Sequence, residues 1–174
     1  DHNIENAKID NSNQFLWRQN RRRLDAESLR DTVLFVSGKM NLKMGGPSFK
    51  DFVIEKPQHS PHYQYHKYDP DDVSTHRRSI YRFIVRSQPQ PFMDTFDCAD
   101  PSQLVDKRGE TTTALQALAL LNNQFMVKMS KNFAENVSKK SVAGAVRSAF
   151  EMAVSRIPTD EELELLNLYA KYED

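Results

Sequence analysis

The sequence contains one cysteine, no excess of either charge and no long apolar run, and each absence excludes a class of protein. Cys98 alone cannot form an internal disulfide or provide the C-x-x-C-H motif that covalent haem attachment needs. Lys and Arg number 24, as do Asp and Glu, and the resulting net charge of zero argues against a nucleic-acid-binding protein. No apolar run reaches the roughly 18 residues of a membrane span. We therefore expect no cofactor, no nucleic-acid partner and no membrane span in this chain.

The 174 residues suffice for one domain with a hydrophobic core, or for two small lobes at most. Apolar residues make up 39% and the mean hydropathy is −0.69, which is polar for a globular domain but too rich in Phe, Leu and Val for disorder. The chain opens on "DHNIENAKID", so we interpret it as a single domain or a fragment of a larger protein. We divide it into a loose segment (1–20), a helix with an irregular region (21–110) and C-terminal helices (111–174).

Local signals predict helices toward both ends of the chain. Apolar residues recur at helical spacing after Asp25, which has the side chain of an N-cap, and Gly38 lies where this helix would end. Residues 49–76 are irregular, and "FVIE" and "YQYHKY" within them are β-prone segments that form a small hairpin or an ordered loop. Thr159 and Glu162 form a capping box before the last helix. The fold class we predict is mainly α, a helical bundle with a loop-rich middle segment and at most one short β-hairpin.

The segment "TTTALQALALLNNQF" predicts a helix that Thr112 or Thr113 caps and that continues to about Val137. One helical stripe, which we expect to be buried, contains Leu115, Leu118, Asn122, Phe125, Met129 and Phe133. Gln116 lies on a flanking stripe. Since a buried unpaired amide costs about 1–3 kcal/mol, we expect Gln116 and Asn122 to bond to backbone of the adjoining irregular segment. Ligand binding by these amides is the alternative.

Four groups of motifs, in order along the chain, resemble one known family. They are "RRRLDAESLRD" with "VSG" and "GGPS", "RRSIYRF" with "FDCADPS", "TTTALQALALLNNQF", and "AFEMAVSRIPTDEEL". Together, from about Asn20 onward, they resemble the planctomycete-type domain of unknown function 1553. Each motif alone is weak, whereas four in register are specific.

The resemblance implies a place in the C-terminal portion of a large exported bacterial protein with cytochrome-c-like modules upstream. Some relatives also carry carbohydrate-binding or lectin-like modules. It therefore implies an extracytoplasmic location and, as partners, the upstream domains of the same polypeptide. The family provides no catalytic residues to carry over, so the catalytic residues, and whether the chain is part of an enzyme, stay open.

The histidines of "HSPHYQYH" are weak candidates for a metal site. Three imidazoles, those of His59, His62 and His66, could hold zinc if the loop folded around the ion. No cysteine or carboxylate set accompanies them, and the intervening prolines and aromatics suit a surface loop. We favour loop histidines without a metal.

Arginines and aspartates in the middle of the chain are the candidate ligand or anion site. If "RRSIYRF" is helical, Arg78 and Arg82 lie along one face, and Asp94 and Asp97 follow in a proline-rich segment. We expect Arg78 to contact Asp94, Asp97 or nearby carbonyl groups and so to tie this segment to the helices. The alternative is a site for a sulfated or acidic glycan. A further arginine run, residues 21–23, opens the first helix.

Three functions remain open at this point. The leading hypothesis is a non-catalytic helical module that packs against neighbouring cytochrome-c-like domains, and a broad apolar patch would favour it. The alternative is part of an enzyme acting on polysaccharide or in redox chemistry, which a pocket lined by Arg78, Asp97 and Asn122 would favour. A glycan-binding module is the third, and an aromatic platform on "HYQYHKY" would favour that.

Overall fold

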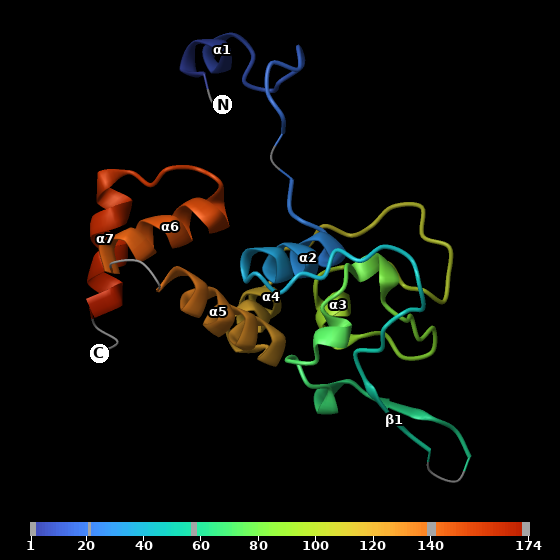
Figure 1. The fold of residues 1–174 in the computed structure, drawn as a ribbon. Coiled ribbons are helices and arrows are strands. Elements are labelled where there is room, and N and C mark those ends of the chain that lie inside the picture. The colour runs from blue at the N-terminus through green and yellow to red at the C-terminus, as the bar shows by residue number, and fades with distance from the viewer. Residues whose placement is uncertain (1–2, 21, 57–58, 139–141, 172–174) are drawn as a thin grey trace.

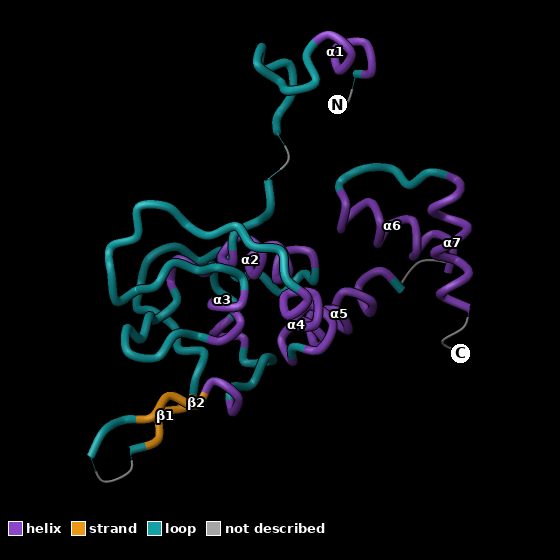
Figure 2. The backbone as a smooth tube through the Cα atoms, turned by 180° about the vertical axis from the view of Figure 1, so that it is seen from behind, coloured by secondary structure: helices purple, strands orange, loops and turns teal. Residues whose placement is uncertain are grey.

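The computed structural model describes residues 3–20, 22–56, 59–138 and 142–171, so Arg21 of the arginine run lies outside the described residues. The described chain is mainly helical, with one small antiparallel sheet in a loop-rich middle, which confirms the predicted fold class (Figures 1 and 2). The helices are α1 (Ile4–Ile9), α2 (Ala26–Val36), α3 (Pro91–Thr95), α4 (Ala114–Asn122), α5 (Gln124–Val137), α6 (Val142–Val154) and α7 (Asp160–Lys171). The strands are β1 (Val53–Glu55) and β2 (His62–Gln64), and the 3-10 turns are η1 (Tyr65–Lys67), η2 (Val73–Thr75) and η3 (Ser79–Tyr81).

The N-terminal segment, predicted to be loose, contains a short helix that lies apart from the rest of the fold (Figure 1). Asn3 caps α1, and the Asp10 carboxylate accepts hydrogen bonds from the N–H groups of Gln14 and Phe15 at 2.9 and 2.8 Å. No residue of α1 is buried. Polar side chains close in sequence therefore give this segment its shape, and its apolar residues contribute no core.

Helix α2 forms as its sequence predicts and provides one wall of the core. The Asp25 carboxylate caps it by accepting from the N–H of Ser28 at 2.7 Å, and Gly38 follows its end with a φ of 73°. Other residues rarely adopt this φ, and a Cβ on Gly38 would lie 2.7 Å from the Asn136 side-chain nitrogen, so the position favours glycine. The core lies between α2, α3 and α5 and consists of Ala26, Leu34, Phe92, Met93, Phe96, Phe125 and Met129.

The middle of the chain forms the small hairpin that the β-prone segments allow. Strands β1 and β2 pair antiparallel, with Ile54 opposite Tyr63. Beside the hairpin, the buried Phe52 ring meets the rings of Tyr63, Tyr65 and Phe83 edge-on. The pattern of "RRSIYRF" was ambiguous between strand and helix and slightly favoured helix, whereas the segment forms the 3-10 turn η3 and extended backbone. Arg78 and Arg82 are therefore not on one helical face.

The long helix predicted to run to about Val137 is interrupted at Asn123. This residue ends α4 with extended backbone, and its side chain accepts from the N–H of Phe125 at 3.0 Å, which caps α5. Because the two helices have different directions, the predicted buried stripe does not continue across them. Phe125 and Met129 are buried as expected, whereas Leu115 and Leu118 are exposed.

The C-terminal helices extend the chain away from this core. Helix α6 packs against α5, and α7 packs against α6 (Figure 1). The predicted capping box of α7 is confirmed, since Thr159 N–H donates to Glu162 at 2.9 Å and Glu162 N–H donates to Thr159 at 3.3 Å. Of the helices in the described part of the chain, none has the length and apolar character needed to cross a membrane.

Candidate ligand-binding cavity

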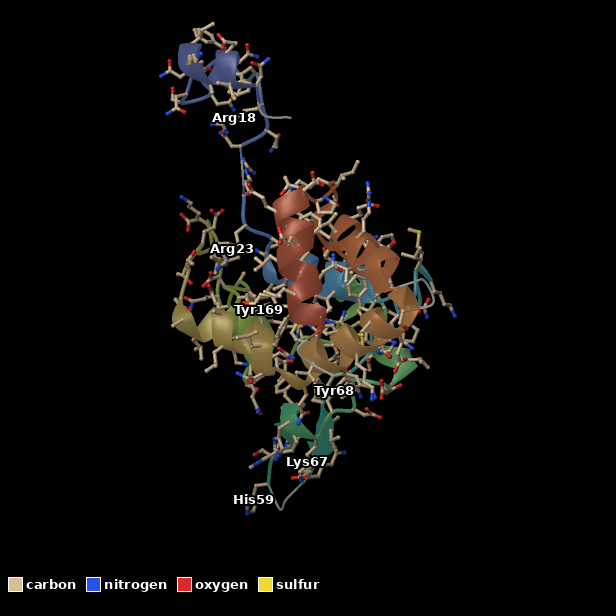
Figure 3. The ribbon with its side chains drawn as sticks, turned by 90° about the vertical axis from the view of Figure 1, so that its left-hand side faces the viewer. Arg18, Arg23, His59, Lys67, Tyr68 and Tyr169 are labelled. Atoms are coloured by element: carbon tan, nitrogen blue, oxygen red, sulfur yellow. The ribbon has the colours of Figure 1, made fainter. Side chains whose placement is uncertain are left out.

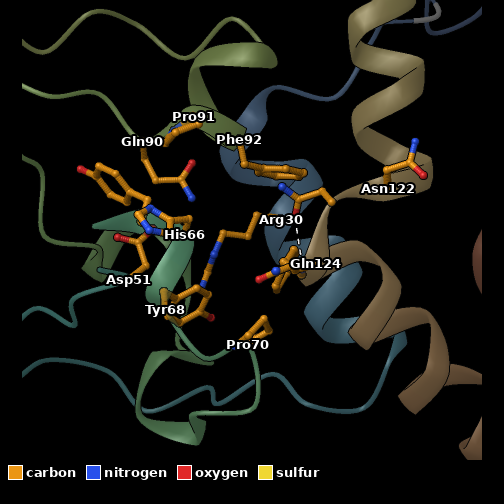
Figure 4. Close-up of a pocket in the computed structure, with 13 residues that line it drawn as sticks. Arg30, Asp51, His66, Tyr68, Pro70, Gln90, Pro91, Phe92, Asn122 and Gln124 are labelled. Carbon is orange, nitrogen blue, oxygen red and sulfur yellow. Dashed lines mark hydrogen bonds between the residues drawn. The ribbon is translucent and has the colours of Figure 1, made fainter. Parts of the chain in front are cut away.

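A cavity of about 330 Å³ lies where α2, the start of α3 and the α4–α5 junction meet the loops around β1 and η1 (Figure 4). Its walls combine a buried arginine, a buried carboxyl group, aromatic rings and amides. The lining residues used below are Arg30, Asp51, Tyr65, His66, Tyr68, Pro70, Gln90, Phe92, Asn122, Gln124 and Phe125. In Figure 4, Asp51 and His66 lie on one side of the Arg30 side chain and Gln124 lies on the other.

Arg30 projects from the buried face of α2 and is only 4% exposed. Its two terminal nitrogens donate to the carbonyl oxygens of Arg77 and Thr75 at 2.9 and 2.6 Å. The guanidinium also lies over the rings of Phe49 and Phe125, at 4.9 and 5.6 Å from their centroids. Burial lowers the pKa of Arg30, but an arginine keeps its charge in proteins. The cavity therefore has a fixed positive charge that already holds backbone in place.

Asp51 provides the opposite charge, and it is the least satisfied group of the cavity. Its side chain belongs to a residue only 3% exposed, and its Oδ1 atom has no hydrogen-bond donor among the described residues. Burial raises the pKa of Asp51, while the nearby Arg82 and Arg30 act in the opposite direction. A buried polar atom without a partner costs about 1–3 kcal/mol, so this carboxyl group reduces the stability of the free protein.

Aromatic rings and amides complete the walls. Tyr65 donates its hydroxyl to the carbonyl of Gln88 at 2.8 Å, and burial raises the pKa of Tyr65 to about 12. The Tyr68 hydroxyl lies 2.9 Å from the Thr75 hydroxyl, and burial raises its pKa too. Both tyrosines therefore stay neutral at any physiological pH. The rings present apolar surface, and the amides of Gln90, Asn122 and Gln124 add donors and acceptors.

The predicted amides have separate roles. Gln116 is buried, and its Oε1 atom accepts from the Arg23 guanidinium at 2.9 Å while its Nε2 atom donates to the Thr95 carbonyl at 3.0 Å. It thus bonds to backbone of the adjoining segment, as expected, and forms a capping box with Thr113. The prediction that Asn122 is buried and bonds to the adjoining segment was wrong. Asn122 is exposed and donates to the Leu118 carbonyl of its own helix at 3.2 Å. It lies at the edge of the cavity, where α4 ends, with its side chain turned away from the other labelled residues (Figure 4).

The proline-rich segment is tied to the rest of the fold by an arginine–aspartate pair, as predicted, but the arginine is Arg23 and not Arg78. Arg23 pairs with Asp97 at 2.5 Å, and Asp97 also accepts from the N–H of Thr111 at 2.8 Å. Backbone N–H from Thr111 and the Arg23 guanidinium lower the pKa of Asp97. Arg78 is about half exposed, and its nearest carboxylate belongs to Asp31, at 4.0 Å. The prediction for Arg78 was wrong because η3 directs it toward α2.

The remaining candidates do not join the main cavity. Arg82 and Asp94 line a separate cavity of about 40 Å³ beside Cys98. The Cys98 thiol lies 3.5 Å from the Glu27 carboxylate, and burial together with that negative charge raises the pKa of Cys98. A thiol held in its neutral form is a poor nucleophile.

The histidine loop is spread out. His59 and His62 are exposed, and Figure 3 shows His59 at the far end of the hairpin, away from Tyr68. Only His66 reaches the main cavity. In the stretches that the structure describes, no group of three or more His, Cys, Asp or Glu side chains could hold a metal ion.

Two central residues of the cavity were missed by sequence reasoning. Arg30 does carry a signal, because it lies four residues from both Ala26 and Leu34 on the buried stripe of a helix, where a charge needs a specific partner. Asp51 carries none, because nothing in "FKDFVIE" marks its carboxyl group as buried.

Comparison with protein families gives one finding. The family model PSD1, described as a protein of unknown function (DUF1553), matches residues 1–170. Neither curated proteins nor solved structures yield a match.

Proposed function

This chain belongs to the PSD1 family of proteins of unknown function (DUF1553), and we propose that it is a non-catalytic packing module whose helix α4 docks on another domain of the same longer polypeptide. The observation that carries the proposal is the orientation of α4. Its polar Gln116 is buried, whereas Leu115, Leu118 and Leu121 are 63%, 54% and 75% exposed. A helix that lies on a water-facing surface normally has the reverse arrangement.

Tertiary bonds fix this orientation. Gln116 is held by the Arg23 guanidinium and by the Thr95 carbonyl, and it closes the capping box of α4 with Thr113. Rotating the helix to bury its leucines would break these bonds and leave buried polar groups unpaired, at about 1–3 kcal/mol each. Summed over the groups at Gln116, Arg23 and Thr95, that cost is comparable to the gain of about 1.5–3 kcal/mol for each of the leucines. The leucines therefore stay available to a partner.

The composition of α4 defines the partner's chemistry. No charged residue occurs between Thr111 and Val127, so the complementary face is apolar and carries no charge that docking would leave desolvated. A nine-residue helix offers far less than the roughly 800 Å² per partner that stable complexes between separate molecules bury. A covalently tethered domain needs less area, because the tether raises its effective concentration.

The family resemblance supplies the occupant that we propose, a cytochrome-c-like module upstream in an extracytoplasmic protein. In that arrangement the module supplies the redox chemistry, and the present chain contributes a rigid apolar face. The proposal assigns no catalytic residue to this chain.

Leu118→Glu tests the proposal because it places a charge at the centre of the face. In the isolated 174-residue chain we expect almost no change in Tm, since the side chain is already exposed. In the full-length protein we expect this domain to unfold at a higher temperature than in isolation, and Leu118→Glu to remove the difference. Leu104→Glu, in an exposed loop, is the matched control and should leave the difference intact.

Two results would overturn the proposal. One is identical unfolding of the domain in the isolated chain and in the full-length protein. The other is self-association of the isolated chain at micromolar concentration that Leu118→Glu abolishes, since the occupant would then be a second copy.

A further inference from the structure

The main cavity does not depend on the α4 leucine face, and its chemistry indicates a ligand. We propose that it binds an uncharged, hydroxyl-rich ring, the terminal residue of an oligosaccharide. The cavity contains one buried positive group, Arg30, and one buried carboxyl group, Asp51. An anionic ligand would meet Asp51 and a cationic ligand would meet Arg30, so either charge would face a like charge in a site of low dielectric.

Arg30 is also unsuited to bind an anion directly. Recognition of sulfate or carboxylate by arginine uses parallel N–H groups of the guanidinium fork. Here both terminal nitrogens already donate to backbone carbonyls, at Arg77 and Thr75. The charge orders the loops around the cavity, and the ligand meets it without forming an ion pair.

Asp51 fits a hydroxyl in either protonation state. An ionised carboxylate accepts a hydrogen bond, and a protonated carboxyl group can donate one. A hydroxyl group is both donor and acceptor, so it matches both states, whereas an ammonium group matches only the first. Asp51 lines the cavity and lacks a hydrogen-bond partner for its Oδ1 atom in the described part of the molecule, so its carboxyl group is the one that a sugar hydroxyl would pair with.

The walls match the two surfaces of a sugar ring. The rings of Tyr65, Tyr68, Phe92 and Phe125 offer apolar faces for its C–H groups, and the lining amides offer hydrogen bonds for its outer hydroxyls. Two of these rings come from the "HYQYHKY" segment. Apolar and aromatic walls with a few convergent polar groups are the usual composition of small-molecule sites.

The surroundings of the cavity indicate a chain and not an isolated ring. Its volume of about 330 Å³ is near the lower end of the roughly 300–1,000 Å³ of ligand pockets. A shallower hollow of about 450 Å³ adjoins it and shares Pro70, Asn122 and Gln124 with it. The hollow continues along α5 past the ion pair of Lys128 with Asp71, at 2.5 Å. The remaining residues of an oligosaccharide whose terminal residue occupies the cavity would lie along this hollow.

The test uses three uncharged trisaccharides, maltotriose, cellotriose and mannotriose, with inorganic sulfate and spermidine as charged comparators. Backbone amide NMR signals of the complete chain report the binding site. We expect saturable shifts at residues 65–68 and 122–125 with at least one trisaccharide, and none there with sulfate or spermidine. Asp51→Leu should weaken binding about tenfold or more, and Gln124→Ala, an exposed change that the fold tolerates, about threefold.

Asp94→Leu is the matched control, because it removes an exposed aspartate outside this cavity and should leave the affinity unchanged. The proposal fails if none of the trisaccharides shifts residues 65–68 or 122–125, which would leave the cavity to water. It also fails if sulfate or spermidine alone binds there, or if Gln124→Ala and Asp51→Leu leave trisaccharide binding unchanged. Should Asp51→Leu not fold, the Gln124→Ala result and the shift pattern decide.

Discussion

Replacing Asp51 by leucine is expected to stabilise the free protein, even though the position is buried. Leucine has the same number and branching of side-chain heavy atoms as aspartate, its larger methyl groups lie beside a cavity, and it has no polar atom to satisfy. The Asp51 side chain forms no salt bridge within the described residues, and its Oδ1 atom has no partner there. Removing an orphaned buried group is neutral or stabilising, whereas removing one member of a buried hydrogen-bonded pair is strongly destabilising.

The size of the effect follows from the cost of the unpaired group, about 1–3 kcal/mol at neutral pH. Part of it is offset because Arg30 and Arg82 lose a nearby opposite charge. A net gain of about 1 kcal/mol corresponds to a Tm increase of about 2–4 °C for a chain of this length. Thermal unfolding followed by circular dichroism measures it.

The pH dependence provides an internal check. Because burial raises the pKa of Asp51 above 3.8, its contribution to stability is fully present below pH 3.8 and is lost as pH rises through the folded-state value. The advantage of Asp51→Leu should therefore be largest at neutral pH and shrink toward about pH 3. A fall in Tm by several degrees at pH 7, or an advantage that grows on acidification, would refute the reasoning.

Three further predictions concern the Arg23–Asp97 pair, the α4 face and the last helix. Arg23→Ala should lower the free energy of unfolding by about 1–3 kcal/mol, because partners such as the buried Gln116 lose their donor. Arg78→Ala should lower it by less than about 1 kcal/mol, because that ion pair is exposed, and urea unfolding of both variants compares the two effects. In the isolated chain, Leu118→Glu should not lower Tm and should reduce binding of a hydrophobic dye, whereas a clear drop in Tm would show that the face is packed. Arg156 and the N–H of Thr159 lower the pKa of Glu162 to about 2. The stability advantage of wild type over Glu162→Gln should therefore be full above pH 4.5 and disappear as the pH falls toward 2. Acid titration of helicity measures this loss.

The helices with strong local signals could be predicted from the sequence. Asp25 at the start of α2, Gly38 after its end, and the Thr159–Glu162 box of α7 act within a few residues of themselves. Such signals do not depend on the rest of the fold, so a single sequence suffices to read them.

The orientation of α4 could not be predicted in this way. A helical wheel identifies stripes, but the inward stripe is chosen by what the helix packs against. Here the choice depends on the bond between Gln116 and Arg23, which are 93 residues apart. The break at Asn123 depends likewise on how α5 turns to bury Phe125 against α2 and α3.

The cavity could not be predicted either, because residues far apart in the sequence form it. Arg30 and Asp51 come from elements with no shared motif, and they meet only when the loops after η1 and before α3 close around them. The aromatic residues of "HYQYHKY" were recognised as a possible platform, and Tyr65 and Tyr68 do line the cavity. On the α4–α5 junction, Phe125 was assigned to the core, and Asn122 was a candidate ligand residue but in a set with Arg78 and Asp97, which do not line this cavity.

The central claim, that α4 is covered by another domain of the same polypeptide, is tested most directly by amide hydrogen exchange over residues 114–122. Exchange is compared between the isolated chain and the full-length protein under identical conditions, with α2 as the internal reference. The proposal predicts that α4 exchanges more slowly in the full-length protein while α2 is unchanged. Equal exchange of α4 in both would contradict it.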